Sequence, residues 1–145
     1  MPQISRNALV MYSAQEMYHL VNDVSAYAEF LPHCSDAKII AQSANEMTAA
    51  LEISKAGLKK WFTTKNTLIE NQAVHMQLLD GPFKTLSGGW TFKVLDEHAC
   101  KVSLDLEFEF TNRLVEMAFG KVFNEVATNM ITAFTQRAKQ VYGVR

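Results

Sequence analysis

Cysteine is scarce in this chain of 145 residues: Cys34 and Cys100 lie far apart and form no CxxC pattern. The four histidines are scattered too, so no spacing typical of a zinc site is present. We interpret both cysteines as buried free thiols in a reducing compartment. A chain of this length buries roughly two-thirds of its unfolded surface, so it needs neither a disulfide nor a metal to fold. We expect residues 1–145 to form a single domain.

Long apolar runs are missing as well. No stretch approaches the roughly 20 residues of a membrane-spanning helix, and residues 1–6 lack the apolar core of a signal peptide. These features predict a cytoplasmic protein without a membrane span.

Charge of one sign does not dominate either, because 14 Lys and Arg balance 15 Asp and Glu for a net charge of -1. Proteins that bind duplex DNA usually carry a basic excess, so we do not expect duplex DNA as a partner.

Alternation of apolar and polar residues is the clearest pattern that is present, and it runs through residues 101–111. Its apolar members are Val102, Leu104, Leu106, Phe108 and Phe110. A period of two predicts a strand with one buried face. Residues 47–53, 74–78 and 90–94 repeat the alternation, and turn signals recur about every dozen residues. With a strand at 3–12, the pattern predicts an antiparallel meander of about seven strands.

Helical patterns flank this region. Ser13 and Glu16 have the spacing of a capping box, and a second short helix is expected at residues 25–30. After Asn112 the apolar period becomes 3.6, and the apolar side chains fall within an arc of about 120°. These side chains are Val115, Phe119, Val122, Phe123, Val126, Met130, Phe134 and Val141. With Asn112 as the N-cap and Gly143 at the other end, a helix of about 30 residues is expected.

These elements predict an α+β fold. A sheet with one apolar face needs a cover, and the C-terminal helix is long and apolar enough to provide it. We expect a curved antiparallel sheet that grips this helix, with the two short helices plugging one end. The space between sheet and helix is either filled by side chains or left partly open, and the sequence allows both. Gly120 within the helix indicates close packing or a bend.

Several segments resemble the START-like coenzyme Q-binding family of the polyketide cyclase and lipid-transport superfamily. Residues 27–34, YAEFLPHC, resemble that family's Y-x-x-F-L-P-x-C pattern, although many members have Trp or Gly at the position of His33. Further matching segments follow in order at 62–64, 81–92, 108–112 and 118–123. The resemblance spans nearly the whole chain, and within the family it is greatest to the bacterial ribosome association toxins.

This resemblance implies a helix-grip (START/Bet v 1-like) fold with a hydrophobic tunnel. It implies a polyprenyl lipid such as ubiquinone as the ligand, with no cofactor required. We expect Phe30, Leu31 and Pro32 at the mouth of the tunnel, although ordinary core packing explains each expected lining residue at least as well. The remaining expected contacts are Phe83, Leu86, Trp90, Phe92, Phe108, Phe110, Phe119, Phe123 and Met130.

The resemblance to the toxins implies binding to the large ribosomal subunit, inhibition of subunit association, and an antitoxin partner. Lysines cluster between Glu52 and Glu70, where no acidic residue occurs. The candidate contacts with ribosomal RNA are Lys55, Lys59, Lys60, Trp61 and Lys65. Positive charges beside an exposed aromatic ring suit phosphates and an unpaired base. A solvated hairpin is the alternative interpretation.

An aromatic polyketide cyclase is the alternative function, and it requires an acid and a base inside the cavity. Strand parity supplies few inward polar candidates, namely Arg6, Lys55 and either Lys65 or Asn66. None of them forms a nucleophile–base pair. We therefore predict a binding protein and not an enzyme.

Overall fold

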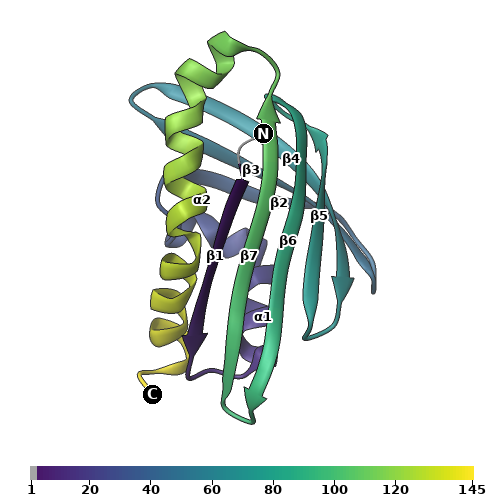
Figure 1. Cartoon of the computed structure of the whole chain (residues 1–145), viewed down its shortest axis with the longest axis vertical. Helices are drawn as coiled ribbons and strands as arrows, with labels where there is room; N and C mark the ends of the chain where they lie inside the picture. The colour runs from purple at the N-terminus through teal and green to yellow at the C-terminus, as the bar shows by residue number, and fades with distance from the viewer. Residues whose placement is uncertain (1–2) are drawn as a thin grey trace.

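One antiparallel sheet of seven strands, with the strand order β1-β7-β6-β5-β4-β3-β2, organises the chain (Figure 1). The computed structural model describes residues 3–145. The strands are β1 (Gln3–Val10), β2 (Cys34–Gln42), β3 (Glu46–Lys55), β4 (Leu58–Ile69), β5 (Ala73–Asp80), β6 (Phe83–Asp96) and β7 (Ala99–Phe110). The helices are α1 (Ala14–Asn22), the 3-10 helix η1 (Val24–Glu29) and α2 (Arg113–Tyr142). The predicted α+β helix-grip arrangement is confirmed.

The chain crosses the sheet once and then returns strand by strand. After β1, helices α1 and η1 carry it to β2 at the opposite edge, and the meander from β2 to β7 brings it back beside β1. Helix α2 then runs along the sheet next to β1 (Figure 1). We call the face that packs on α2 the inner face and the opposite one the outer face.

Two adjacent glycines in β6 allow unusually close approach of the neighbouring strands. Gly88 and Gly89 have φ values of +130° and +156°. A Cβ atom on Gly88 would lie 2.0 Å from the carbonyl oxygen of Asp105, and one on Gly89 would lie 2.0 Å from that of Val74. Irregular register at both ends of the β6–β7 ladder adds to the bending. These features let the sheet curl toward α2.

The inner face and α2 share one hydrophobic core. Every second residue of β7 from Val102 to Phe110 is buried, as the alternation predicts. Two predictions for the ends of elements are wrong. Val141 is 51% exposed, and Ala138 is the last buried residue of α2. Val94 is 65% exposed even though it pairs with the buried Cys100, and the regular register of β6 ends directly after it.

Side-chain caps define the starts of α1 and α2, as predicted. The Ser13 hydroxyl accepts from the Glu16 backbone N–H, and the Glu16 carboxylate accepts from the Ser13 N–H. The Asn112 side chain accepts from the Val115 N–H at 2.9 Å. Gly120 packs tightly, because an added Cβ would come within 3.4 Å of the Phe110 ring. No helix in residues 3–145 has both the length and the apolarity that a membrane crossing demands.

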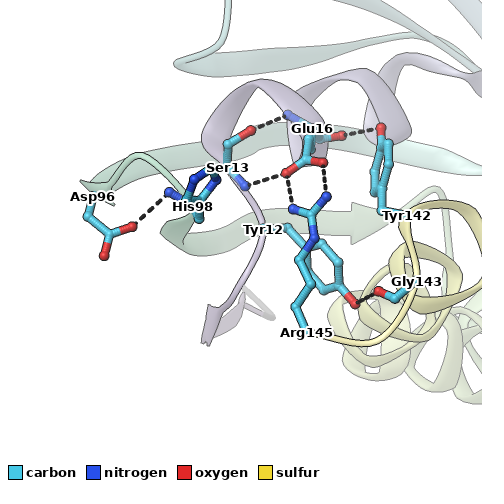
Figure 2. A network of polar contacts seen from close by, with 8 residues as sticks. All are labelled: Tyr12, Ser13, Glu16, Asp96, His98, Tyr142, Gly143 and Arg145. Carbon is cyan, nitrogen blue, oxygen red and sulfur yellow. Dashed lines mark hydrogen bonds and ion pairs between the residues drawn. The ribbon is translucent and has the colours of Figure 1, made fainter.

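A polar clamp fastens the end of α2 to the start of α1 (Figure 2). Arg145 donates two hydrogen bonds to the Glu16 carboxylate, at 2.6 and 2.8 Å. The hydroxyl of Tyr12 donates to the carbonyl of Gly143, and the hydroxyl of Tyr142 donates to the carbonyl of Glu16. Glu16 therefore serves both the α1 cap and the α2 clamp.

Replacing Gly89 with alanine tests whether the close strand approach is essential. We expect Gly89→Ala to lower the free energy of unfolding by about 3 kcal/mol or more, because backbone atoms cannot move away from the new methyl group. The control is Gly57→Ala, a position with φ of +85° and no atom within 4 Å of an added Cβ. It should cost about 1 kcal/mol, from backbone strain alone. Equal losses in urea unfolding would contradict the close-approach explanation.

The clamp predicts a pH-dependent contribution to stability. The hydrogen bonds from Arg145 hold the pKa of Glu16 below its ordinary value. A carboxylate with a lowered folded-state pKa stabilises the fold above its unfolded-state pKa, and this stabilisation is lost as the pH falls through the folded-state pKa. Glu16→Gln, which keeps a capping side chain, should be less stable than wild type at pH 7 and equal to it in strong acid. Glu97→Gln, in an exposed turn, is the control; a Glu16→Gln deficit independent of pH would refute the ion-pair explanation.

Candidate functional site

A small cavity lies between the inner face and α2. Its volume is about 60 Å³. Strands β3 to β7 line one side of it, and α2 and η1 line the other. The lining residues are Val24, Tyr27, Ala49, Leu51, Phe62, Thr64, Asn66, Met76, Leu86, Trp90, Leu106, Phe123, Val126, Ala127 and Met130. Side chains thus fill most of the space between sheet and helix, and a cavity remains.

The walls of this cavity carry no charged side chain among the described residues. Its polar groups come from Tyr27, Thr64, Asn66 and the indole N–H of Trp90. The Tyr27 hydroxyl donates to the backbone carbonyl of Val21, and burial raises its pKa well above the ordinary value. The Thr64 hydroxyl donates to Oδ1 of Asn66 at 2.8 Å. An apolar molecule with few polar atoms is the chemical match for such walls.

The cavity is smaller than the ligand that the sequence leads us to expect. Ligand pockets usually measure about 300–1,000 Å³, and a dry cavity of about 150 Å³ suffices for benzene. A quinone ring therefore enters the cavity of about 60 Å³ only if wall side chains move. Met76 and Met130 are partly buried and line it. Their unbranched thioether side chains change rotamer at low cost, so these are the wall residues that we expect to move when a ring enters.

The predicted contact residues divide into two groups. Leu86, Trp90, Phe123 and Met130 line the cavity. Outside it lie the buried side chains of Leu31, Phe83, Phe92, Phe108, Phe110 and Phe119, the half-buried Phe30 and the exposed Pro32. The segment at residues 30–32 is thus beside the site, and the same stretch of chain contributes Val24 and Tyr27 instead.

Most buried residues of the second group belong to a phenylalanine cluster at the β7–α2 end of the core. Its members are Phe62, Phe83, Phe108, Phe110, Phe119 and Phe123. Phe83 lies at its centre, with ring centroids 4.8 Å from Phe123 and 5.1 Å from Phe110. The Phe83–Phe110 pair is stacked and the Phe83–Phe123 pair is edge-to-face, and aromatic pairs of either kind add about 0.5–1.5 kcal/mol each beyond area burial. The cluster fixes the first half of α2 against the sheet and so forms one wall of the site.

Ion pairs hold α2 over the cavity. Glu125 on α2 meets Lys55 at 3.0 Å and His33 at 3.3 Å, and the Lys55 hydrogen bond lowers the pKa of Glu125. Further along α2, Arg137 pairs with Glu29 of η1 at 3.1 Å. Its guanidinium also lies over the Phe30 ring, 5.0 Å from the ring centre. These contacts tie the helix to β3 and η1 on either side of the cavity.

Sequence reasoning missed much of the lining, including Ala49, Leu51, Thr64, Met76 and Val126. The alternation of residues in β4 could have identified part of it, because Phe62, Thr64 and Asn66 alternate with residues on the outer face. Of the two alternatives Lys65 and Asn66, Asn66 is the inward residue, whereas Lys65 lies on the outer face and pairs with Glu46 at 2.9 Å.

The remaining polar candidates do not assemble into a catalytic site. Arg6 is exposed on β1, and Lys55 is exposed and bonded to Glu125, so neither lines the cavity. Asn66 does line it. Among residues 3–145, no three His, Cys, Asp or Glu side chains are grouped to hold a metal ion. Cys34 and Cys100 are buried free thiols as predicted, and burial raises the pKa of each to about 11.

The lysine-rich segment differs from the expected array of four free lysines beside an exposed ring. Lys55 and Lys65 form ion pairs, with Glu125 and Glu46. Trp61 is half-buried, and the ammonium group of Lys38 lies 4.8 Å from its ring centre. Lys59 and Lys60 are exposed and form no ion pair with residues 3–145. These two lysines remain available for an anionic partner.

Known proteins resemble this chain in both sequence and structure. It is 57% identical over 145 residues to the ribosome association toxin RatA of Escherichia coli K12, covering 100% of this chain and 92% of that protein. It is 28% identical over 143 residues to the mitochondrial coenzyme Q-binding protein COQ10 of Drosophila melanogaster, covering 96% of this chain and 59% of that protein.

Solved structures show the same fold at low sequence identity. A START superfamily protein from Mycobacterium smegmatis matches with a TM-score of 0.79 and 20% identity, over 96% of this chain and 98% of that one. The Zhui aromatase/cyclase from Streptomyces sp. R1128 matches with a TM-score of 0.78 and 16% identity, over 99% of both chains. Residues 10–135 match the family model described as polyketide cyclase / dehydrase and lipid transport. The chain therefore belongs to the polyketide cyclase / dehydrase and lipid transport family.

Proposed function

We propose that this protein binds a neutral, apolar molecule of the polyprenyl quinone type in the cavity under α2, without catalysing a reaction. The observation that carries the proposal is the lining, which is apolar and contains no carboxylate, histidine, lysine or arginine among the described residues. Burying apolar surface contributes about 25 cal/mol per Å², so such a molecule binds by desolvation alone. A cyclase would need an acid and a base at the same place.

The comparisons support a quinone-type ligand at the level of the family. The Drosophila relative is named for binding coenzyme Q, and the family description includes lipid transport. Entry of the ring requires Met76 and Met130 to rearrange, and a prenyl tail requires α2 to move away from η1 or β3. The ion pairs of Glu125 and Arg137 are partly exposed, so breaking them costs little.

Filling the cavity with protein atoms tests this proposal. Solvent extraction of the wild-type protein, followed by mass spectrometry, should release a prenylated quinone, and added ubiquinone should raise the melting temperature. Ala127→Leu puts three more carbons at a lining position and should abolish the rise. Ala118→Leu, at an exposed position of the same helix, should keep it. No extracted lipid together with an unchanged wild-type melting temperature would disprove quinone binding.

We propose a second role, in which the protein binds the large ribosomal subunit in the cytoplasm and inhibits subunit association. Its support is the 57% identity to a protein named ribosome association toxin. Lys59 and Lys60, next to the β3–β4 turn, are the cations that we expect to contact ribosomal phosphates. The toxin name of this relative also supports an antitoxin partner for this chain. The ligand site lies inside the fold and these lysines lie outside it, so both roles are compatible.

Charge reversal separates the ribosomal role from the ligand role. Overproduced wild-type protein should deplete joined ribosomes in sucrose gradients, and the Lys59→Glu, Lys60→Glu double variant should lose this effect while still binding ubiquinone. The matched control is Lys93→Glu with Lys101→Glu, which makes the same change in charge at an opposed pair on β6 and β7. An unchanged wild-type gradient would eliminate the ribosomal role, and an active double variant would eliminate this contact surface.

A further inference from the structure

A polar pair interrupts the otherwise apolar inner face at the cavity. Among residues 3–145, and leaving aside the tyrosines, Thr64 and Asn66 are the buried side chains that carry an amide, a hydroxyl or a charge. Each is 6% exposed. They lie two residues apart on β4, so both side chains point from the same face of the strand. Both line the cavity.

The surroundings of this pair offer no polar partner from the neighbouring strands. Asn66 lies opposite Met47 in β3 and Met76 in β5. Thr64 lies opposite Ala49 and Leu78. A buried polar group in such a setting costs stability unless its hydrogen bonds are made. The hydrogen bonds of Thr64 and Asn66 must therefore be made within the pair or with a molecule in the cavity.

The hydrogen bond within the pair leaves donors unused. The Thr64 hydroxyl donates to Oδ1 of Asn66, which is the acceptor end of the amide. A primary amide carries two N–H donors at its other end, and Nδ2 of Asn66 donates to no residue within 3–145. Packing does not cover this nitrogen either. Among the described residues, Oδ1 of Asn71 is the fully buried side-chain polar atom that lacks a partner, and Nδ2 of Asn66 is not such an atom. The free donors therefore face the cavity that Asn66 lines.

We propose, resting on the ligand-binding function above, that Thr64 and Asn66 form a head-group site that selects neutral ligands with a hydrogen-bond-accepting oxygen, such as a carbonyl. Asn66 donates an N–H to that oxygen, and Thr64 orients the amide by holding Oδ1. The apolar walls take the hydrocarbon part of the ligand. Anionic lipids are rejected, because the lining has no cation to pair with a carboxylate or phosphate and burying an unpaired charge is expensive.

Three small probes with the same hydrocarbon part test this selectivity on the wild-type protein. These are 4-butylacetophenone, which carries a neutral carbonyl, butylbenzene, which carries no oxygen, and 4-butylbenzoate, which is an anion at pH 7.5. Isothermal titration calorimetry should give a Kd for the ketone about tenfold below that for butylbenzene, the effect of about one net hydrogen bond. The Kd for the benzoate should be the highest of the three.

Removing the whole polar pair should abolish the preference without removing the cavity. The Thr64→Val, Asn66→Leu double variant replaces both partners with apolar groups of similar shape, a change that a core tolerates well. It should bind ketone and hydrocarbon equally, with the Kd for butylbenzene unchanged or lower. Thr63→Val is the control, because Thr63 alternates with the inward residues of β4 and lies on the outer face; it should keep the tenfold preference.

The outcomes separate this inference from the function on which it rests. Equal wild-type affinities for ketone and butylbenzene would overturn the head-group site and leave apolar binding intact. Wild-type binding to neither neutral probe would overturn the ligand-binding function itself. A preference that persists in the folded double variant would also overturn the assignment to Thr64 and Asn66. The wild-type comparison can overturn the head-group site by itself, so the proposal stays testable even if the double variant fails to fold.

Discussion

Burial of α2 against the inner face of the sheet is the interaction on which the rest of the structure depends. The sheet has one apolar face, and an open face of that kind is unstable in water unless another element covers it. Helix α2 covers it with Phe119, Phe123 and Phe134, each at most 3% exposed. The Phe134 ring meets Tyr27, Phe30 and Trp90 at centroid distances of 5.2, 5.1 and 5.2 Å. The same residues that fold the protein therefore also enclose its candidate site.

The cavity exists because the two ends of this interface are packed differently from its middle. At one end, the phenylalanine cluster fills the space between β7 and α2, and at the other end the clamp of Glu16 and Arg145 closes the helix onto α1. In the middle, small side chains such as Ala49 and Ala127 line the cavity together with the flexible Met76 and Met130. Small and adaptable walls allow a core to open locally while its ends stay fixed.

The family to which the chain belongs includes both cyclases and lipid carriers, so the fold alone does not decide the chemistry. What decides it is the set of groups that face the cavity. Here those groups are hydrocarbon, the thioethers of Met76 and Met130, the indole of Trp90, a tyrosine hydroxyl already bonded to the backbone, and the amide of Asn66 with its threonine partner. Among the described residues, this set includes no carboxylate, histidine, lysine or arginine, the side chains that most often transfer protons in catalysis. The exterior lysines are separate from it and suit a different kind of partner.

The sequence by itself determined the helices and strands and which face of each one is buried in the core. Strict alternation in β7 and the 3.6-residue period of α2 each allow one buried face, so the helix-grip arrangement followed, as did the capping residues Ser13 and Asn112. These are local properties, which depend on neighbours along the chain. Family resemblance added the expected kind of ligand.

Only the tertiary structure decided which residues reach the cavity and how large it is. Parity within β4 distinguishes Asn66 from Lys65, but the partners of each depend on the register with β3 and β5. Whether Trp61 is free or covered depends on Lys38, which lies two strands away in β2. A cavity is the small volume left over when many side chains from distant segments pack together, and no local pattern along the chain encodes that remainder.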